Sequence, residues 1–285
     1  MRGSPLFRRH TLRSCSSFWI SELLMNGWVL LVQSVLLLAL PGILLNSWMR
    51  KREAQDRPEI SGALRPMHKV IISYCALFHR LKTNGWAPLP EHGPAILIAN
   101  HTCGIDHMIL QAGCRRVLGF MIAREFYEWP SIHWFCKLVH CIPVNRDGRD
   151  VHATRRALGA LAEGRVLPIF PEGRITPLSG RVIGEIRPGA AFIAVRSGAP
   201  VFPAYIRGTP ATNQIGESLT TPSAAVVTFG PPIDLSDFRP EQAGDKNVQA
   251  EVSRRFLHAL LDLQARSRSE VTQPVGTAYP RMVAG

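Results

Sequence analysis

The chain has 285 residues, and its 33 lysine and arginine residues outnumber 21 aspartate and glutamate residues, which gives a formal net charge of +12. This length allows one large domain or two small ones. A basic surface suits anionic lipids, acyl thioester carriers or nucleic acid, but the sequence has no zinc-finger pattern, RNA-recognition signature or dense basic and aromatic stripe, so we expect no nucleic-acid partner. The six cysteines form no C-x-x-C pair, which favours reduced thiols and a folded domain on the cytoplasmic face over a disulfide framework.

The first element in chain order is an apolar segment that runs from Gly27 to Leu45 with only two clearly polar interruptions. A segment of about 19 residues can span a bilayer core of roughly 30 Å as a transmembrane helix. A cleaved signal peptide is disfavoured, because the polar region before the segment is long and no small-x-small cleavage site follows it. Basic residues flank both ends, so the positive-inside rule gives no orientation. A single span and a segment that dips into the membrane and returns at Pro41-Gly42 both fit.

The next element, from Leu64 to Lys82, has apolar residues at helical spacing and basic residues on the opposite side of the helix. A basic amphipathic helix can lie in the plane of a membrane interface. An ordinary helix whose apolar stripe packs on the catalytic domain explains the pattern equally well. With the apolar segment before it, this helix defines a membrane-associating helical leader over residues 1–85.

From Trp86 to Arg266, short apolar runs alternate with segments of helical periodicity. We predict strands at 94–99, 117–123, 141–144, 166–170, 201–206 and 224–229, and helices from 106 and at 132–139, 151–163, 188–197 and 247–266. This order predicts one α/β domain over residues 86–266, with a mixed or mostly parallel sheet flanked by helices. Residues 267–285 lack periodicity, and we expect them to form a flexible tail.

A histidine and an aspartate follow the first of these strands: His101 lies in the turn after 94–99, and Asp106 lies near the start of the next helix. Ligands of open α/β sheets bind at the carboxyl ends of strands. The Asp106 carboxylate can accept a hydrogen bond from one imidazole nitrogen and leave the other free as a base, with no serine or cysteine in the position of a triad nucleophile. A local helix cap or a satisfied polar contact is the simpler alternative.

A metal site is a further alternative for the same turn, because Asp106-His107 superficially matches the end of the H-x-H-x-D-H zinc pattern of metallo-hydrolases. The two upstream histidine positions hold Thr102 and Gly104, however, so only two of the four ligands are present. We therefore expect no metal at this turn.

Three further blocks follow in order along the chain, and each joins an apolar strand to a polar residue or a proline. They comprise Asn145-Arg146 after the strand at 141–144, Pro171-Glu172-Gly173-Arg174 after the strand at 166–170, and Pro203 within the strand at 201–206. Four blocks in this order are far more specific than the histidine and aspartate alone.

With these blocks, roughly Trp86 to Asp237 resembles the phospholipid/glycerol acyltransferase family, which includes the lysophosphatidic acid (1-acyl-sn-glycerol-3-phosphate) acyltransferases. The family's blocks are N-H-x-x-x-x-D, an aspartate or asparagine followed by arginine, F-P-E-G, and a proline-centred strand. The resemblance implies that His101 is the general base and that Asp106 orients it. It also implies a set of residues that bind substrate or shape the site for the acceptor's phosphate, namely Asn100, Arg146, Glu172, Gly173, Arg174 and Pro203.

The resemblance implies a membrane-bound transferase of phospholipid biosynthesis, whose partners are membrane lipid, a lysophospholipid acceptor and acyl-CoA or acyl-carrier protein. We expect it to acylate the free hydroxyl of 1-acyl-glycerol-3-phosphate, giving phosphatidic acid, with no cofactor beyond the acyl donor. One departure leaves the acceptor headgroup open: Arg174 directly follows Gly173, whereas many members read F-P-E-G-T-R. Glycerol 3-phosphate, lysophosphatidylethanolamine and a lyso-aminolipid are the alternative acceptors. A metal-dependent hydrolase and a catalytically silent lipid-binding protein are the alternatives from other classes.

Overall fold

The computed structural model describes residues 60, 62, 64–145 and 150–272, all within the second of two units, which begins at Pro58. The predicted apolar segment from Gly27 to Leu45 lies outside these residues, so the membrane-associating leader stays a prediction. Within the described part of the chain, no helix combines the length and the apolar character needed to cross a membrane.

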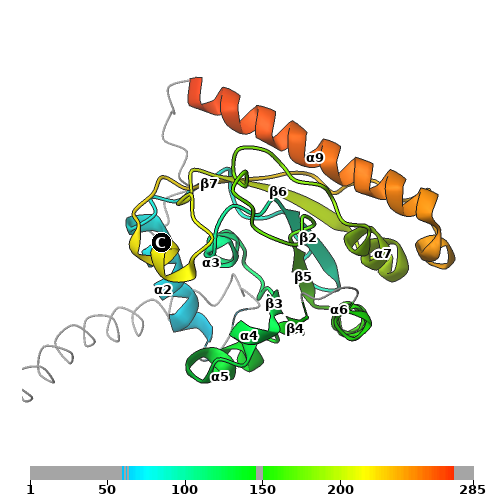
Figure 1. The fold of residues 1–285 in the computed structure, drawn as a ribbon, viewed down its shortest axis with the longest axis horizontal. Coiled ribbons are helices and arrows are strands. Elements are labelled where there is room, and N and C mark those ends of the chain that lie inside the picture. The colour runs from blue at the N-terminus through cyan, green and yellow to red at the C-terminus, as the bar shows by residue number, and fades with distance from the viewer. Residues whose placement is uncertain (1–59, 61, 63, 146–149, 273–285) are drawn as a thin grey trace, which may run out of the picture. The chain divides into compact units, whose positions relative to one another are not determined.

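A five-stranded sheet forms the centre of this unit (Figure 1). All neighbouring strands in it are parallel except β6 and β7, so the expected α/β fold with a mixed, mostly parallel sheet is confirmed. A second sheet has two parallel strands, β3 (Met121–Ala123) and β4 (Ile142–Val144). The strands of the large sheet, in spatial order, are β1 (Lys82–Thr83), β7 (Val226–Phe229), β6 (Val201–Arg207), β2 (Ala95–Ala99) and β5 (Val166–Ile169).

The described helices match the predicted periodic segments most closely in the middle of the domain. They are, in chain order, α2 (Leu64–Leu77), α3 (Asp106–Ala112), α4 (Arg124–Tyr127), α5 (Pro130–Leu138), α6 (Val151–Ala162), α7 (Pro188–Ser197), α8 (Ile215–Thr220) and α9 (Lys246–Thr272), with a 3₁₀ turn at Pro240–Gly244. The last helix continues past Arg266, so the first part of the expected flexible tail is helical.

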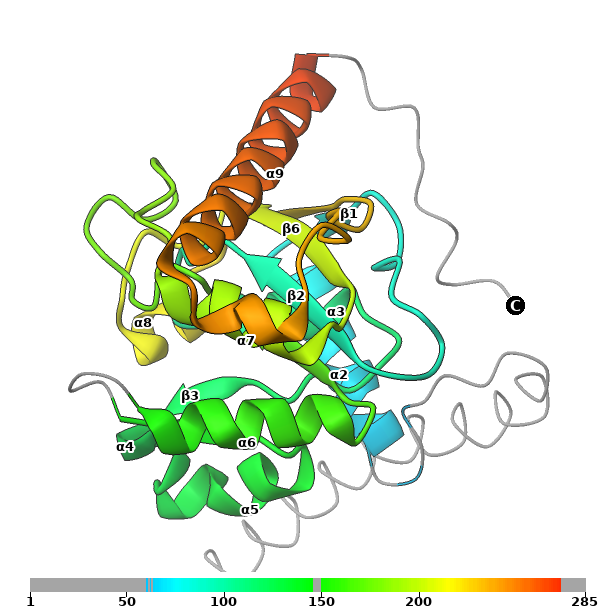
Figure 2. The same cartoon turned by 90° about the vertical axis from the view of Figure 1, so that its right-hand side faces the viewer.

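Helices cover both faces of the large sheet, which explains why β2 is apolar throughout instead of alternating with polar residues (Figure 2). Ile96 and Ile98 pack on one face with α6, α7 and α9. Leu97 and Ala99 pack on the other face with α2 and α3. All four side chains are fully buried. The strand is therefore fixed from both sides, and so is the start of the turn that follows it.

Two predicted elements are shorter in the structure than in the sequence interpretation. The strand predicted at 117–123 contributes only three residues to β3, and Leu118 makes an isolated bridge to Val166 instead of a continuous ladder. The helix predicted to reach Lys82 ends at Leu77. Arg80 takes a left-handed conformation with φ of 45°, and Lys82 pairs with Val226 in β7.

The apolar stripe of α2 is divided between the core and the surface. Ile71, Ile72 and Tyr74 pack with the buried Cys75 against the helix-covered sheet. Val70 and Leu77, in contrast, are 67% and 82% exposed. Part of the stripe therefore packs on the domain, as one of the two interpretations predicted, whereas contact with a membrane interface stays a prediction.

Candidate active site

The turns after β2 and β5 meet at one edge of the sheet. The two strands are parallel neighbours, with Leu97 opposite Pro168, so their carboxyl ends lie side by side. The backbone N–H of His101, in the first turn, donates to Glu172 Oε1, in the second, over 2.8 Å. Two blocks that are far apart in the sequence thus form one site.

Asp106 is fully buried at the first position of α3. Its carboxylate accepts hydrogen bonds from His101 Nδ1 over 2.8 Å, from the Thr102 hydroxyl over 2.5 Å, and from the Cys103 backbone N–H over 3.0 Å. The Thr102 backbone N–H donates to the same carboxylate. These donors offset the cost of burying a negative charge, which the amino end of a helix also favours. The carboxylate is therefore held in one orientation toward the histidine.

The His101 ring is fixed by a hydrogen bond and by an aromatic contact. Nδ1 donates to Asp106, and the ring lies flat against Phe170, with centroids 4.1 Å apart and planes inclined by 10°. The His101 side chain is 21% exposed, and no described residue hydrogen bonds to its Nε2. Nε2 is therefore the nitrogen that can take a proton from a substrate.

The nearby Cys103 and His107 both stay neutral close to pH 7. Burial, reinforced by the charge of Asp106, raises the pKa of the Cys103 thiol to about 12. Burial lowers the pKa of His107 to about 4, against the attraction of Asp106. A protonated thiol is a poor nucleophile, so His101 is the group in this turn that is placed for chemistry. Among the described residues, no three His, Cys, Asp or Glu side chains are grouped to hold a metal ion.

Glu172 ties the two turns to the loop that follows them. It is buried; its Oε1 accepts the His101 backbone N–H, and its Oε2 accepts the Gly184 backbone N–H, each over 2.8 Å. Because both oxygens are engaged with backbone donors, the structure places Glu172 as a positioning residue rather than as a group that faces the acceptor.

Basic groups flank the turn after β5. Arg174 is exposed on the turn, and Arg187 lies immediately before α7. The Arg187 Nε donates to the Glu172 carbonyl oxygen over 3.1 Å. Gly173 has a φ of +70°, and a Cβ atom there would lie 2.8 Å from the Arg187 Cδ. The glycine thus permits both the left-handed turn and the close approach of Arg187.

Arg187 and Thr209 belong to the site but were missed in the sequence interpretation. The only signal for Arg187 was the next residue, Pro188, which marks the start of a helix. The amino end of a helix favours an anion. Thr209 follows β6, and its hydroxyl hydrogen bonds with the Thr102 hydroxyl over 2.7 Å. No sequence pattern indicated Thr209.

Three of the residues predicted for the site are not part of the arrangement around His101 and Glu172. Arg146 lies outside the described residues. The buried Asn100 exchanges hydrogen bonds of 2.8 and 2.7 Å with the backbone of Ile206, so it joins β2 to β6 instead of facing a substrate. Pro203 lies within β6 opposite Ile98 and borders a hollow beside α9, so it is part of the sheet and not of the site.

Comparison with known proteins gives a consistent result. Residues 80–207, which contain both turns, match the family model described as Acyltransferase. A lyso-ornithine lipid O-acyltransferase of Rhodobacter capsulatus is 27% identical over 208 residues, covering 64% of this chain and 74% of that protein. A 1-acyl-sn-glycerol-3-phosphate acyltransferase of Bacillus subtilis is 26% identical over 151 residues, covering 53% and 72%.

The fold is also that of a solved structure. The crystal structure of the 1-acyl-sn-glycerophosphate acyltransferase PlsC from Thermotoga maritima matches with a TM-score of 0.57 at 23% identity, covering 87% of this chain and 98% of that one. The matched region carries the buried Asp106, the oriented His101 and the Glu172 tie described above. Residues 80–207 therefore match the acyltransferase family, and the chain is an acyltransferase.

Proposed function

We propose that this enzyme transfers a fatty acyl chain from acyl-CoA or acyl-carrier protein to the free hydroxyl of 1-acyl-glycerol-3-phosphate, giving phosphatidic acid. The observation that carries the proposal is the His101–Asp106 pair, in which Nε2 of His101 is left open. The neighbouring turn carries Arg174, and Arg187 donates to the Glu172 carbonyl oxygen of that turn. A base beside cationic groups suits an acceptor that has both a hydroxyl and a phosphate. We expect the enzyme to act on the cytoplasmic face of a membrane, because the acceptor is a membrane lipid.

The transfer needs one base and no covalent enzyme intermediate. Nε2 of His101 takes the proton of the acceptor hydroxyl while the hydroxyl oxygen attacks the thioester carbonyl carbon. General base catalysis of this kind raises the reaction rate by roughly 10²- to 10⁴-fold. A C–O bond forms, the C–S bond breaks, and the proton moves from Nε2 to the departing thiolate. Asp106 stabilises the imidazolium that exists between these steps. The neutral Cys103 thiol supports direct transfer, because it is a poor nucleophile for an acyl-enzyme route.

The acceptor's phosphate requires donors close to the base. Arg174 and Arg187 offer guanidinium groups, and each charge-assisted hydrogen bond to phosphate contributes about 1.5–3 kcal/mol. Arg187 also lies at the amino end of α7, where backbone N–H groups favour an anion. These features support a phosphorylated acceptor rather than a neutral one.

A lyso-aminolipid is the second candidate acceptor. The relative from Rhodobacter capsulatus, named for a lyso-ornithine lipid, matches more of this chain than the relative from Bacillus subtilis does. The direct succession of Gly173 and Arg174 also departs from the common F-P-E-G-T-R pattern. Both candidates use the same base, so the headgroup is what an experiment must distinguish.

The test is acyl transfer from a labelled long-chain acyl-CoA to a panel of lyso-acceptors, in membranes that contain the intact chain, His101→Ala or the control His152→Ala. We expect transfer to lysophosphatidic acid that His101→Ala abolishes and that the exposed His152→Ala leaves unchanged. Transfer that survives His101→Ala contradicts the mechanism. Transfer only to lyso-ornithine lipid supports the second candidate instead, and loss of activity with a chelator would indicate the metal-dependent class.

A further inference from the structure

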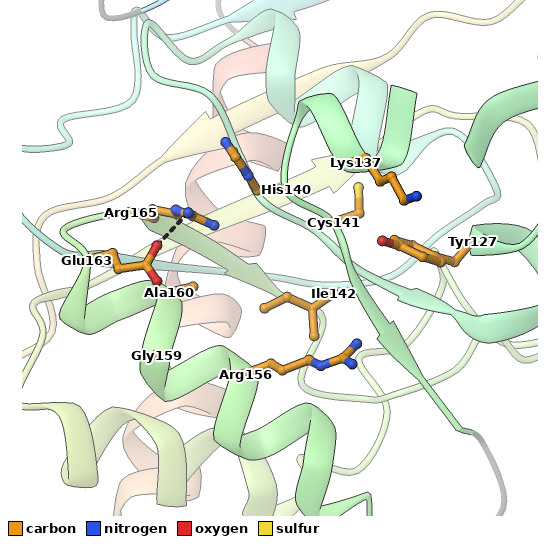
Figure 3. Close-up of a pocket in the computed structure, with 10 residues that line it drawn as sticks. All are labelled: Tyr127, Lys137, His140, Cys141, Ile142, Arg156, Gly159, Ala160, Glu163 and Arg165. Carbon is orange, nitrogen blue, oxygen red and sulfur yellow. Dashed lines mark ion pairs between the residues drawn. The ribbon is translucent and has the colours of Figure 1, made fainter. Parts of the chain in front are cut away.

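An open hollow of about 340 Å³, with a mixed polar and apolar lining, lies beside strand β4 (Figure 3). We refer to it as the cavity. Its walls come from the end of α5, from β4 and from the carboxyl-terminal half of α6. None of the residues that line it belongs to the turns that carry His101 and Glu172. The cavity is therefore a separate feature that the transfer mechanism does not use.

The charge of this cavity is mostly positive. Lys137, Arg156 and Arg165 line it, and a single carboxylate, that of Glu163, forms an ion pair with Arg165. In Figure 3, Lys137 lies on one side of the β4 strand and the pair of Glu163 and Arg165 on the other. Within the part of the chain that the structure describes, neither Lys137 nor Arg156 pairs with a carboxylate. Both side chains are exposed, so they are accessible to an anion that enters the hollow.

The rest of the lining is mixed, with His140 and Cys141 beside apolar and aromatic groups. Ile142 and Ala160 are buried beneath it, and the Tyr127 ring borders it. Gly159 lies in the α6 wall, where an added Cβ would meet no atom within 4 Å. An alanine would therefore fit at this position without a clash, and a longer side chain is needed to fill the hollow. The volume lies at the lower end of the roughly 300–1,000 Å³ typical of small-molecule sites.

A chain of contacts through one strand and two rings links the cavity wall to His101. The Ile142 backbone N–H donates to the Phe120 carbonyl oxygen over 2.8 Å. The Phe120 ring is stacked with the Phe170 ring, with centroids 6.3 Å apart, and the Phe170 ring lies against that of His101. Glu163 and Arg165, however, lie just before the amino end of β5, whereas the turn with Glu172 follows its carboxyl end. A ligand held in the cavity by its charged end must therefore extend along β5 to reach the reacting edge.

We propose that this cavity binds an organic phosphate, with Lys137 and Arg156 on the phosphate and with Tyr127 and Ile142 against its apolar or aromatic part. Two ligands have this chemistry: the nucleotide end of a CoA thioester and the headgroup of an anionic phospholipid. The binding itself is argued from the lining residues alone, whereas its assignment to the acyl donor rests on the proposed function. The donor is the expected source, because the transfer reaction brings a phosphorylated nucleotide to this domain.

The test is titration calorimetry of CoA with the full chain in phosphatidylcholine nanodiscs. Arg156→Gln removes one cation, Gly159→Leu fills the hollow, and Arg155→Gln is the matched control, because Arg155 is exposed on the same helix but does not line the cavity. We expect Arg156→Gln to weaken CoA binding about tenfold or more, through loss of a charge-assisted bond. Gly159→Leu should weaken it at least as much, and Arg155→Gln should leave it within twofold.

A parallel arm distinguishes the two sources of phosphate. Nanodiscs with spin-labelled phosphatidylglycerol report enrichment of that lipid around the chain, and loss of the enrichment in Arg156→Gln but not Arg155→Gln assigns the cavity to the headgroup. Unchanged binding of both CoA and phosphatidylglycerol in Arg156→Gln and Gly159→Leu overturns the proposal. His101→Ala separates the two proposals, because it removes transfer and is expected to retain CoA binding.

Discussion

Replacing Asp106 with asparagine separates the charge of this residue from its hydrogen bonds. Oδ2 accepts from His101 Nδ1 and from the backbone N–H groups of Thr102 and Cys103. Oδ1 accepts from the Thr102 hydroxyl and, over 3.4 Å, from the Cys103 thiol, which is a weak donor. An asparagine with its oxygen in the place of Oδ2 keeps the first set. Its amide nitrogen then faces the Thr102 hydroxyl, which can reverse its bond and donate to Thr209.

Asp106→Asn should therefore cost little stability and much activity. One rearranged hydrogen bond costs about 1 kcal/mol of unfolding free energy. Loss of the negative charge beside the imidazolium costs about 1.5–4 kcal/mol in the transition state, or roughly a ten- to thousandfold fall in kcat. Asp106→Ala, in contrast, leaves several buried donors unpaired at about 1–3 kcal/mol each, so it should unfold far more readily.

The assay measures kcat for acyl transfer and the denaturation midpoint of the same membrane preparations. His152→Ala serves again as the exposed control. The reasoning is refuted if Asp106→Asn keeps kcat within threefold of the parent, because the carboxylate would then contribute nothing to the base. It is also refuted if Asp106→Asn is as unstable as Asp106→Ala.

Three further changes test the surroundings of the base. Glu172→Gln replaces one carboxylate oxygen with an NH₂ group that faces the N–H of either His101 or Gly184. We expect a loss of about 1–3 kcal/mol in unfolding free energy and a lower kcat. An unchanged unfolding free energy and kcat would show that these two hydrogen bonds are dispensable. Gly173→Ala places a side chain in a left-handed turn and against Arg187, which should lower the unfolding free energy by about 1–2 kcal/mol and raise the KM for the acceptor. An unaltered KM would show that Arg187 does not contribute to acceptor binding. The pKa of His107 falls from 6.5 to about 4 on folding, so below pH 6.5 the unfolded chain takes up a proton that the folded chain does not, and stability falls toward pH 4 by up to roughly 3 kcal/mol. Denaturation of His107→Gln across that range should show a smaller loss, and equal pH slopes would contradict the assignment.

The sequence was sufficient for several elements whose pattern was local. The continuous apolar run predicted β2 within a residue, because a strand that is buried on both faces needs apolar side chains at adjacent positions. The proline predicted the start of α7, because its fixed φ suits the first residue of a helix. His101 and Asp106 were found for the same reason, since five residues separate the two partners of one hydrogen bond.

The parts that the sequence could not predict depend on contacts across the fold. Asn100 pairs with the backbone of Ile206, 106 residues away, and nothing in its own turn distinguishes that contact from one with a substrate. Arg187 reaches the site because the loop after Gly173 turns back onto Glu172. The antiparallel pairing of β7 and the short β1 likewise depend on which neighbour remains open once the parallel strands are placed.

The two oxygens of Glu172 have a consequence for how acceptor preference can be changed in this enzyme. One oxygen accepts the backbone N–H of His101, the proposed base, and the other accepts that of Gly184, in the loop that ends at Arg187. A loop taken from a relative with another acceptor would therefore shift the base as well as the headgroup contacts, unless its backbone offered an N–H at the place of Gly184. Chimeras that preserve that single donor should exchange headgroup preference at near-parental rates, whereas chimeras without it should lose turnover on every acceptor.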